Sequence, residues 1–118
     1  MLPPKRQKPI SAPDKEKVEI IINTTCAYFS VDRALIKMPG RLYTNIRRIC
    51  FFLIDKNTEL SHGQIAEFFN QDRSQATRGL DLITAHRNIY TPILHQIRDI
   101  AQICNKFEPK HFEWLILS

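Results

Sequence analysis

Glycine is scarce in this sequence of 118 residues, which contains only Gly40, Gly63 and Gly79. A loop that holds the phosphates of a nucleotide needs several closely spaced glycines and a lysine that follows them. These three glycines are too far apart to form such a loop. The sequence therefore argues against an ATPase.

Spacings typical of metal sites are also missing. Three cysteines and four histidines are spread along the chain, and none are joined by a C-x-x-C or H-x-x-x-H spacing. We therefore expect small buried thiols and surface histidines, and neither a metal site, a cofactor nor catalytic activity. The residues concerned are Cys26, Cys50, Cys104, His62, His86, His95 and His111.

Long apolar runs are absent, since the runs "FFLI" and "WLIL" are each bounded by charge or by the chain end. A membrane span needs about 18 or more continuous apolar residues. The first residues show no cleavable signal pattern, and the odd cysteine number suits a reducing compartment. We expect a soluble cytoplasmic protein with no membrane partner.

Positive charge is in excess, with 17 Lys and Arg residues against 12 Asp and Glu residues. The net charge of +5 favours phosphates, acidic proteins or anionic lipid surfaces, without choosing among them. Residues 1–13 carry four prolines together with Lys5, Arg6 and Lys8. This composition predicts a disordered basic arm, followed by one compact domain over residues 14–107.

Apolar residues recur at helical spacing in the first half of that domain. A first helix is predicted from Asp14, and a short helical turn with Ser30 as its cap is predicted after it. Pro39 and Gly40 stop this turn, and a further helix is predicted from about Thr44. The stripe of this further helix leaves Arg47 and Arg48 outside, and consists of Ile46, Ile49, Cys50, Leu53 and Ile54.

The segment 61–83 has the pattern of a helix-turn-helix. Ser61 and Gln64 have the spacing of a capping box, Ala66 is small enough for a close helix crossing, and Asn70 can end a helix in the left-handed conformation. Asp72 can cap the second helix. Ala76, Leu80 and Ile83 then form its buried stripe and leave an outer face of Arg73, Ser74, Gln75, Thr77 and Arg78.

A last helix is predicted with Thr91 as cap and Pro92 in its first turn. The final segment, residues 108–118, contains more apolar surface than a free tail normally has. We expect this tail to dock on the core or on a partner, which includes a second copy of the chain. The residues predicted to form that interface are Phe112, Trp114, Leu115, Ile116 and Leu117. The expected fold is all-α, with five to six helices.

From about Val18 to Ile83 the sequence resembles the carboxy-terminal DNA-binding domain of the bacterial replication initiator DnaA, a member of the Trp repressor-like superfamily. The matching segments are "YFSVDRALI", "IRRICFFLI" and "LSHGQIAEFFNQDRSQA". The resemblance implies a helix-turn-helix that binds double-stranded DNA in a bacterial or phage cell, near the nucleoid and without the initiator's ATPase part.

The family signature is an arginine or similar residue, aspartate, histidine and two hydroxyl residues at the start of the recognition helix. Here Asp72 matches it and Ser74 matches in type, whereas Gln71, Arg73 and Gln75 depart. Binding is therefore implied, but the family's DNA site is not. The family also inserts a basic loop into the minor groove, and "GRLYTNIRR" occupies that place without the family's arginine-proline-arginine spacing.

The chemistry of the residues supports the same interpretation. Arg73 and Gln75 can make bidentate contacts with base edges, and Asp72 is a cap or a cytosine contact. Residues 38–54 contain three arginines and no acid. The residues predicted to read bases are Asp72, Arg73, Ser74 and Gln75. Those predicted to contact the backbone or minor groove are Arg41, Asn45, Arg47, Arg48, Gln71, Thr77 and Arg78.

Two functions follow as hypotheses. The first is a DNA-binding protein with some sequence preference, acting in transcription regulation or in replication and copy control at initiator-like sites. The second is a protein-interaction module that uses the last helix and the tail, with the arginines serving only as a solvated face.

Overall fold

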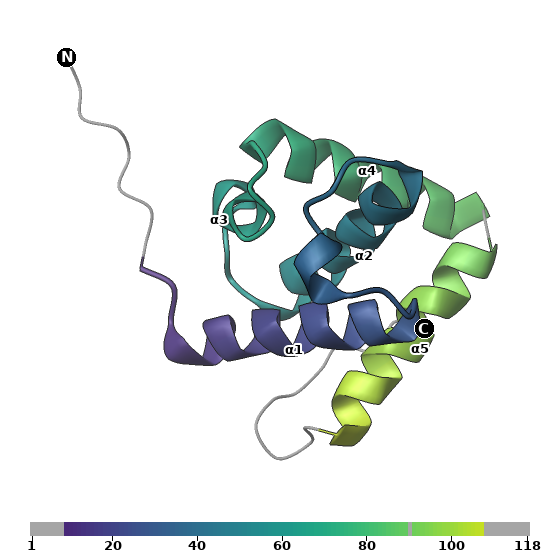
Figure 1. Ribbon diagram of the computed structural model, residues 1–118, viewed down its shortest axis with the longest axis horizontal. Coiled ribbons are helices and arrows are strands. Elements are labelled where there is room, and N and C mark those ends of the chain that lie inside the picture. The colour runs from purple at the N-terminus through teal and green to yellow at the C-terminus, as the bar shows by residue number, and fades with distance from the viewer. Residues whose placement is uncertain (1–8, 90, 108–118) are drawn as a thin grey trace.

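The computed structural model describes residues 9–89 and 91–107, and these residues form helices connected by short turns (Figure 1). No β-strand occurs in these two ranges, which confirms the all-α prediction. The elements are α1 (Ala12–Tyr28), the 3₁₀ turn η1 (Arg33–Leu35), α2 (Arg41–Asn57), α3 (His62–Glu67), α4 (Arg73–Ile89) and α5 (Thr91–Phe107).

Helix α1 begins at Ala12, two residues before the predicted start. Ser11 caps it by accepting a hydrogen bond of 3.2 Å from the Asp14 amide. Pro13 fits in the first turn because the amide that proline lacks has no partner there in any helix. The end of the predicted disordered arm is thus helical, and residues 1–8 of that arm lie outside the described residues.

The chain leaves α1 through Ser30, which has a φ of 56°. The following amide, that of Val31, donates a 2.9 Å hydrogen bond back to the carbonyl of Cys26 and closes the end of the helix. Ser30 therefore terminates α1 and does not cap the next turn. The cap of η1 is Asp32, whose carboxylate accepts from the Ala34 amide at 2.9 Å.

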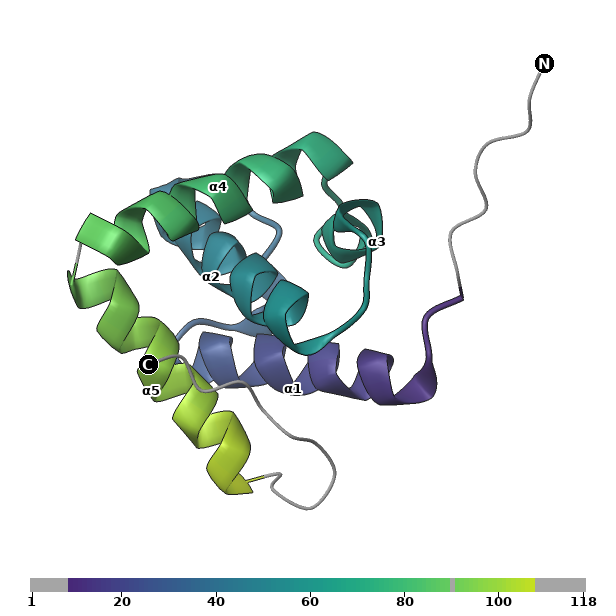
Figure 2. The same cartoon turned by 180° about the vertical axis from the view of Figure 1, so that it is seen from behind.

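Helix α2 begins at Arg41, because Gly40 adopts a φ of 120° and turns the chain into the helix earlier than predicted. Its second half is buried all round, since every residue from Ile49 to Ile54 is at most 3% exposed. The predicted one-sided stripe is therefore wrong here, as Phe51 and Phe52 are also buried. Figures 1 and 2 show α2 in the middle, and it contacts each of the other four helices.

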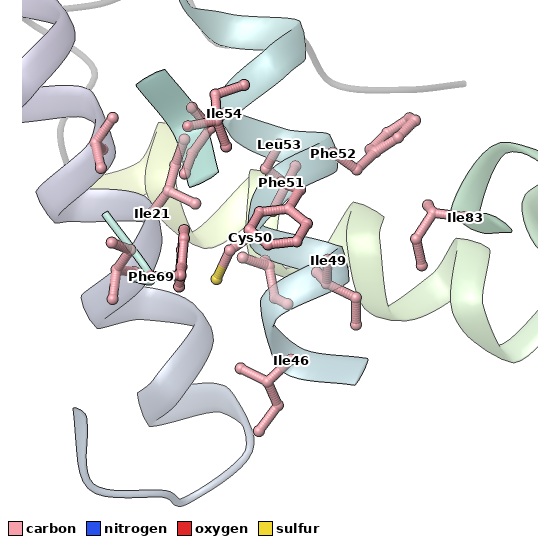
Figure 3. Packing of buried hydrophobic residues seen from close by; sticks show 14 of the residues in the cluster. Ile21, Ile46, Ile49, Cys50, Phe51, Phe52, Leu53, Ile54, Phe69 and Ile83 are labelled. Atoms are coloured by element: carbon pink, nitrogen blue, oxygen red, sulfur yellow. The ribbon is translucent and has the colours of Figure 1, made fainter. Parts of the chain in front are cut away.

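The core is assembled around α2 (Figure 3). In this view Ile21 of α1 and Phe69 lie on one side of α2, and Ile83 of α4 lies on the other. The rings of Phe51 and Phe69 meet edge to face with centroids 5.0 Å apart, an arrangement that aromatic pairs favour. This pair ties the segment after α3 to the central helix.

Helix α5 covers one end of the core with the buried Ile97, Ile100 and Cys104, and the partly buried Ile93 packs against the same core. It begins at Thr91, with Pro92 in the first turn. The tail over residues 108–118, with its predicted docking, lies outside the described residues. Among the helices that are described, none is long and apolar enough to span a membrane.

Three thiols from three different helices are buried: Cys26 of α1, Cys50 of α2 and Cys104 of α5. Burial removes water from the thiolate form and raises the pKa of Cys50 to about 12 from an ordinary value of 9.0. Burial also raises the pKa of Cys26 and of Cys104. This confirms the prediction of buried thiols and makes them poor nucleophiles in the folded protein.

These pKa shifts predict that the fold loses stability in alkaline solution. Unfolded thiols lose their protons near pH 9.0, whereas Cys50 keeps its proton in the folded state up to about pH 12. In that window the unfolded chain binds fewer protons, so the free energy of unfolding falls as pH rises. Urea unfolding at several pH values above 8.5 should show this slope, and Cys50→Ala should reduce it. An equal slope in Cys50→Ala would contradict the assignment.

Candidate nucleic-acid interface

The predicted helix-turn-helix consists of α3, α4 and the turn between them. Ser61 caps α3 by accepting from the Gln64 amide at 3.1 Å, and the Gln64 side chain accepts from the Ser61 amide at 3.0 Å. This reciprocal pair confirms the capping box. It fixes the first turn of a helix that has only six residues and so needs its ends stabilised.

The turn after α3 contains Asn70 with a φ of 54°, which confirms its left-handed conformation. The next amide, that of Gln71, donates a 3.0 Å hydrogen bond to the carbonyl of Ala66. Ala66 itself is fully buried, and α3 packs against α4. The left-handed residue in the turn redirects the chain from α3 into α4.

Asp72 precedes α4, and its carbonyl oxygen accepts from the Gln75 amide at 2.9 Å. Its carboxylate is exposed and makes no hydrogen bond with the described residues. The predicted side-chain cap is therefore not formed. The carboxylate of Asp72 instead stands at the solvent side of the first turn of α4.

Helix α4 buries the predicted stripe of Ala76, Leu80 and Ile83. Its opposite face exposes Arg73, Ser74, Gln75 and Arg78, while Thr77 is half-buried. An open hollow of about 560 Å³ follows this face and is lined by Arg73, Ser74, Thr77, Arg78, Asp81 and Leu82. The structure thus brings most of the predicted contacts of α4 together on one surface.

Sequence reasoning missed Asp81 as a member of this surface. The signal was available, because Asp81 follows Thr77 by four residues and Arg78 by three, the spacing of one helix face. Asp72 and Asp81 together balance the charges of Arg73 and Arg78. Helix α4 alone therefore has little net attraction for phosphates, and additional positive charge must come from a neighbouring element.

That charge comes from the first half of α2. Arg41, Asn45 and Arg48 are spaced by four and three residues and share one face of the helix. Arg41 and Asn45 are exposed, and Arg48 is half-buried. A Cβ atom at Gly79 of α4 would lie 3.1 Å from Cγ of Arg48 and 2.9 Å from Cδ2 of Phe51. The stem of Arg48 therefore crosses the bare backbone of α4 at Gly79.

Arg47 does not belong to this basic face, contrary to the prediction. It is 7% exposed, and its Nη1 donates to the carbonyls of Ile36 and Met38, both at 2.8 Å. Its Nη2 donates to Thr44 Oγ1 at 3.1 Å. Burial, and then the neighbouring charge of Arg48, lower the pKa of Arg47. Arg47 fastens the segment before α2 to the helix and is not available for DNA.

Two further predicted contacts have partners within the fold. The Thr77 hydroxyl lies 2.7 Å from Nδ1 of His62, which is the first residue of α3. His62 Nε2 lies 3.7 Å from a carboxylate oxygen of Asp55 on α2. Gln71 is half-buried in the turn, where its amide bonds to Ala66. His62 is thus a link among three helices, whereas the sequence predicted a surface histidine.

No group of three or more His, Cys, Asp or Glu side chains within residues 9–89 and 91–107 has the geometry of a metal site. The predicted interface residues of the tail, from Phe112 to Leu117, lie outside these ranges.

No protein-family model matches this sequence, and no curated protein is significantly similar to it.

The buried position of Arg47 predicts a large loss of stability in Arg47→Met. Methionine keeps the volume but leaves the carbonyls of Ile36 and Met38 without these donors, which costs about 2–3 kcal/mol. Arg41→Met, at an exposed position, should change the free energy of unfolding by at most about 0.5 kcal/mol. Urea titration followed by circular dichroism measures both. Equal stabilities for the two variants would contradict the structural role of Arg47.

Proposed function

We propose that this domain binds double-stranded DNA with a sequence preference, through the α3–α4 helix-turn-helix. The observation that carries the proposal is the surface formed by the outer face of α4 and the adjoining face of α2. Seven side chains on it make no hydrogen bond or ion pair with other described residues, and remain available to a ligand. They are Arg41, Asn45, Arg48, Arg73, Ser74, Gln75 and Arg78.

The division of charge on this surface suits a protein that both attaches to DNA and reads it. Arg41 and Arg48 lie with Asn45 on one face of α2, and residues 41–48 contain no acid, so the two arginines are the candidates for phosphate contacts. The α4 face has balanced charge and carries planar donors and acceptors, Arg73 and Gln75, which suit base edges. Asp72 and Asp81 can accept from a cytosine amino group.

The resemblance to the DNA-binding domain of the initiator DnaA supports the same function and a role in replication control or transcription. The capping box and the left-handed turn lie within the segment that carries this resemblance. The departures at Gln71, Arg73 and Gln75 affect the turn and the first turn of α4. We therefore propose a DNA site that differs from the family's.

A protein contact is a second candidate, favoured by three exposed apolar side chains around the start of α2. Leu35 is 40% exposed, Met38 is 48% exposed and Leu42 is 51% exposed. Exposed apolar side chains that form one patch mark protein interfaces.

The phosphate-binding role predicts a strong dependence of duplex affinity on salt. Removing two phosphate contacts by Arg41→Ala and Arg48→Ala should weaken all duplexes alike and reduce the slope of log affinity against log salt by about 1.8, or about 0.9 for each contact. Lys15→Ala is the matched control, since Lys15 is exposed on α1, which lies across the molecule from α4 in Figures 1 and 2. Affinity that is independent of salt would refute the proposal.

If α4 reads bases, variants of its outer face should lose affinity for the preferred duplex more than for other duplexes. Arg73→Ala should cost about 1–3 kcal/mol on the preferred duplex and relax the preference at one or two base pairs, because one bidentate contact is lost. Gln75→Ala should relax a different position. Binding profiles over a randomised duplex library measure both, with Gln102→Ala, an exposed position of α5, as control. Profiles identical to the parent's would assign α4 a structural role only.

A further inference from the structure

A chain of three polar side chains crosses the helix-turn-helix and ends on its outer face. It begins at Asp55 on α2, whose carboxylate lies 3.7 Å from His62 Nε2. It continues at His62 Nδ1, which lies 2.7 Å from the Thr77 hydroxyl on α4. The side chains of His62 and Asp55 are 35% and 32% exposed, so the chain is partly shielded from water and still accessible to protons.

The carboxylate of Asp55 decides which nitrogen carries the proton of the neutral imidazole. A proton on Nε2 points its positive end at Asp55, whereas a bare Nε2 would direct a lone pair at the carboxylate. Nδ1 is then the acceptor. Thr77 has one hydroxyl hydrogen, and it must donate that hydrogen to Nδ1. Toward solvent, Thr77 then presents lone pairs only.

Protonation of His62 reverses this arrangement. The imidazolium carries hydrogens on both nitrogens, so Nδ1 donates to the oxygen of Thr77. The hydroxyl hydrogen of Thr77 is released and can donate outward. A phosphate oxygen accepts hydrogen bonds and cannot donate one, so it gains a partner in the protonated state and meets only lone pairs in the neutral state.

The geometry assigns Asp55 and His62 the role of positioning residues that set the hydrogen-bonding direction of Thr77 and thereby make duplex binding tighter as pH falls. This inference rests on the proposed DNA-binding function. Thr77 touches the DNA, and His62 acts through it by taking up one proton at Nδ1.

Charged groups of both signs lie on the elements packed against α3. Arg73 precedes Thr77 by one turn of α4 and opposes a positive ring, and Asp81 follows it by one turn and favours one. The acids are Asp55 on α2, Glu59 before α3, Glu67 on α3 and Asp81 on α4, and the bases are Arg41, Arg47, Arg48 and Lys56 on α2 and Arg73, Arg78 and Arg87 on α4. Among these groups, the Asp55 carboxylate lies 3.7 Å from the imidazole.

The test is duplex affinity measured at constant ionic strength from about pH 8 to about pH 5.5, the range over which histidine titrates. The parent should bind about five- to tenfold more tightly at the lower pH, as one added hydrogen bond to phosphate implies. His62→Gln and Thr77→Val should lose this part of the pH dependence. His95→Gln, at an exposed position of α5, should keep it.

Asp55→Asn tests which partner donates the hydrogen bond between His62 Nδ1 and the Thr77 hydroxyl. Without the carboxylate the neutral ring can carry its hydrogen on Nδ1 and donate to Thr77, so affinity near pH 8 should rise and the pH dependence should flatten. Thermal melting of each variant shows that the folded domain is compared at every pH.

The nitrogen chemical shifts of the imidazole in the DNA-free protein give an independent readout. They should identify the Nε2–H form of neutral His62, and a neutral ring protonated on Nδ1 would overturn the inference. If the parent binds DNA and His62→Gln retains the full pH dependence, the inference fails and the proposed function stands. If the parent binds no duplex at any pH, the proposed function fails and the inference with it.

Discussion

The complete burial of the second half of α2 is the constraint from which the rest of the architecture follows. Six consecutive residues, Ile49 to Ile54, point in every direction around the helix and all need apolar neighbours. Four helices supply them, and α2 contacts each one. The ring of Phe51 packs edge to face with the ring of Phe69 and lies directly against Gly79. The same side chain therefore fixes the segment after α3 and the path of α4.

The first half of α2 has a different environment, because exposed residues alternate there with the buried Ile46 and Arg47. There one arginine stabilises the fold and its neighbour faces the candidate interface. The guanidinium of Arg47 donates hydrogen bonds to the carbonyls of Ile36 and Met38. These carbonyls follow the η1 turn and need donors. Arg48 points to the other side, along Gly79 of α4. A single helix thereby joins the core to the surface that we propose for DNA.

Much of this organisation could be predicted from the sequence because it is local. The capping box at Ser61, the left-handed Asn70 and the exposed face of α4 depend on neighbours within a few residues, and spacing reveals them. The role of Arg47 depends on carbonyls in another segment, and that of His62 depends on Asp55 and on Thr77 fifteen residues away. Spacing along the chain carries no information about such partners, so these residues were assigned to the surface.

Substitutions at Gly79 and substitutions on the exposed face of α4 affect this domain in different ways. The angle of α4 depends on backbone lying directly against Phe51 and the stem of Arg48, with no room for a methyl group. Ser74, Gln75 and Arg78 face solvent and contribute nothing to that packing. These three residues can be replaced one at a time without a change in how α2 and α4 pack. A side chain at position 79 would instead displace α4, and its whole outer face would move with it. The same scaffold can therefore present many different surfaces, provided that position 79 remains glycine.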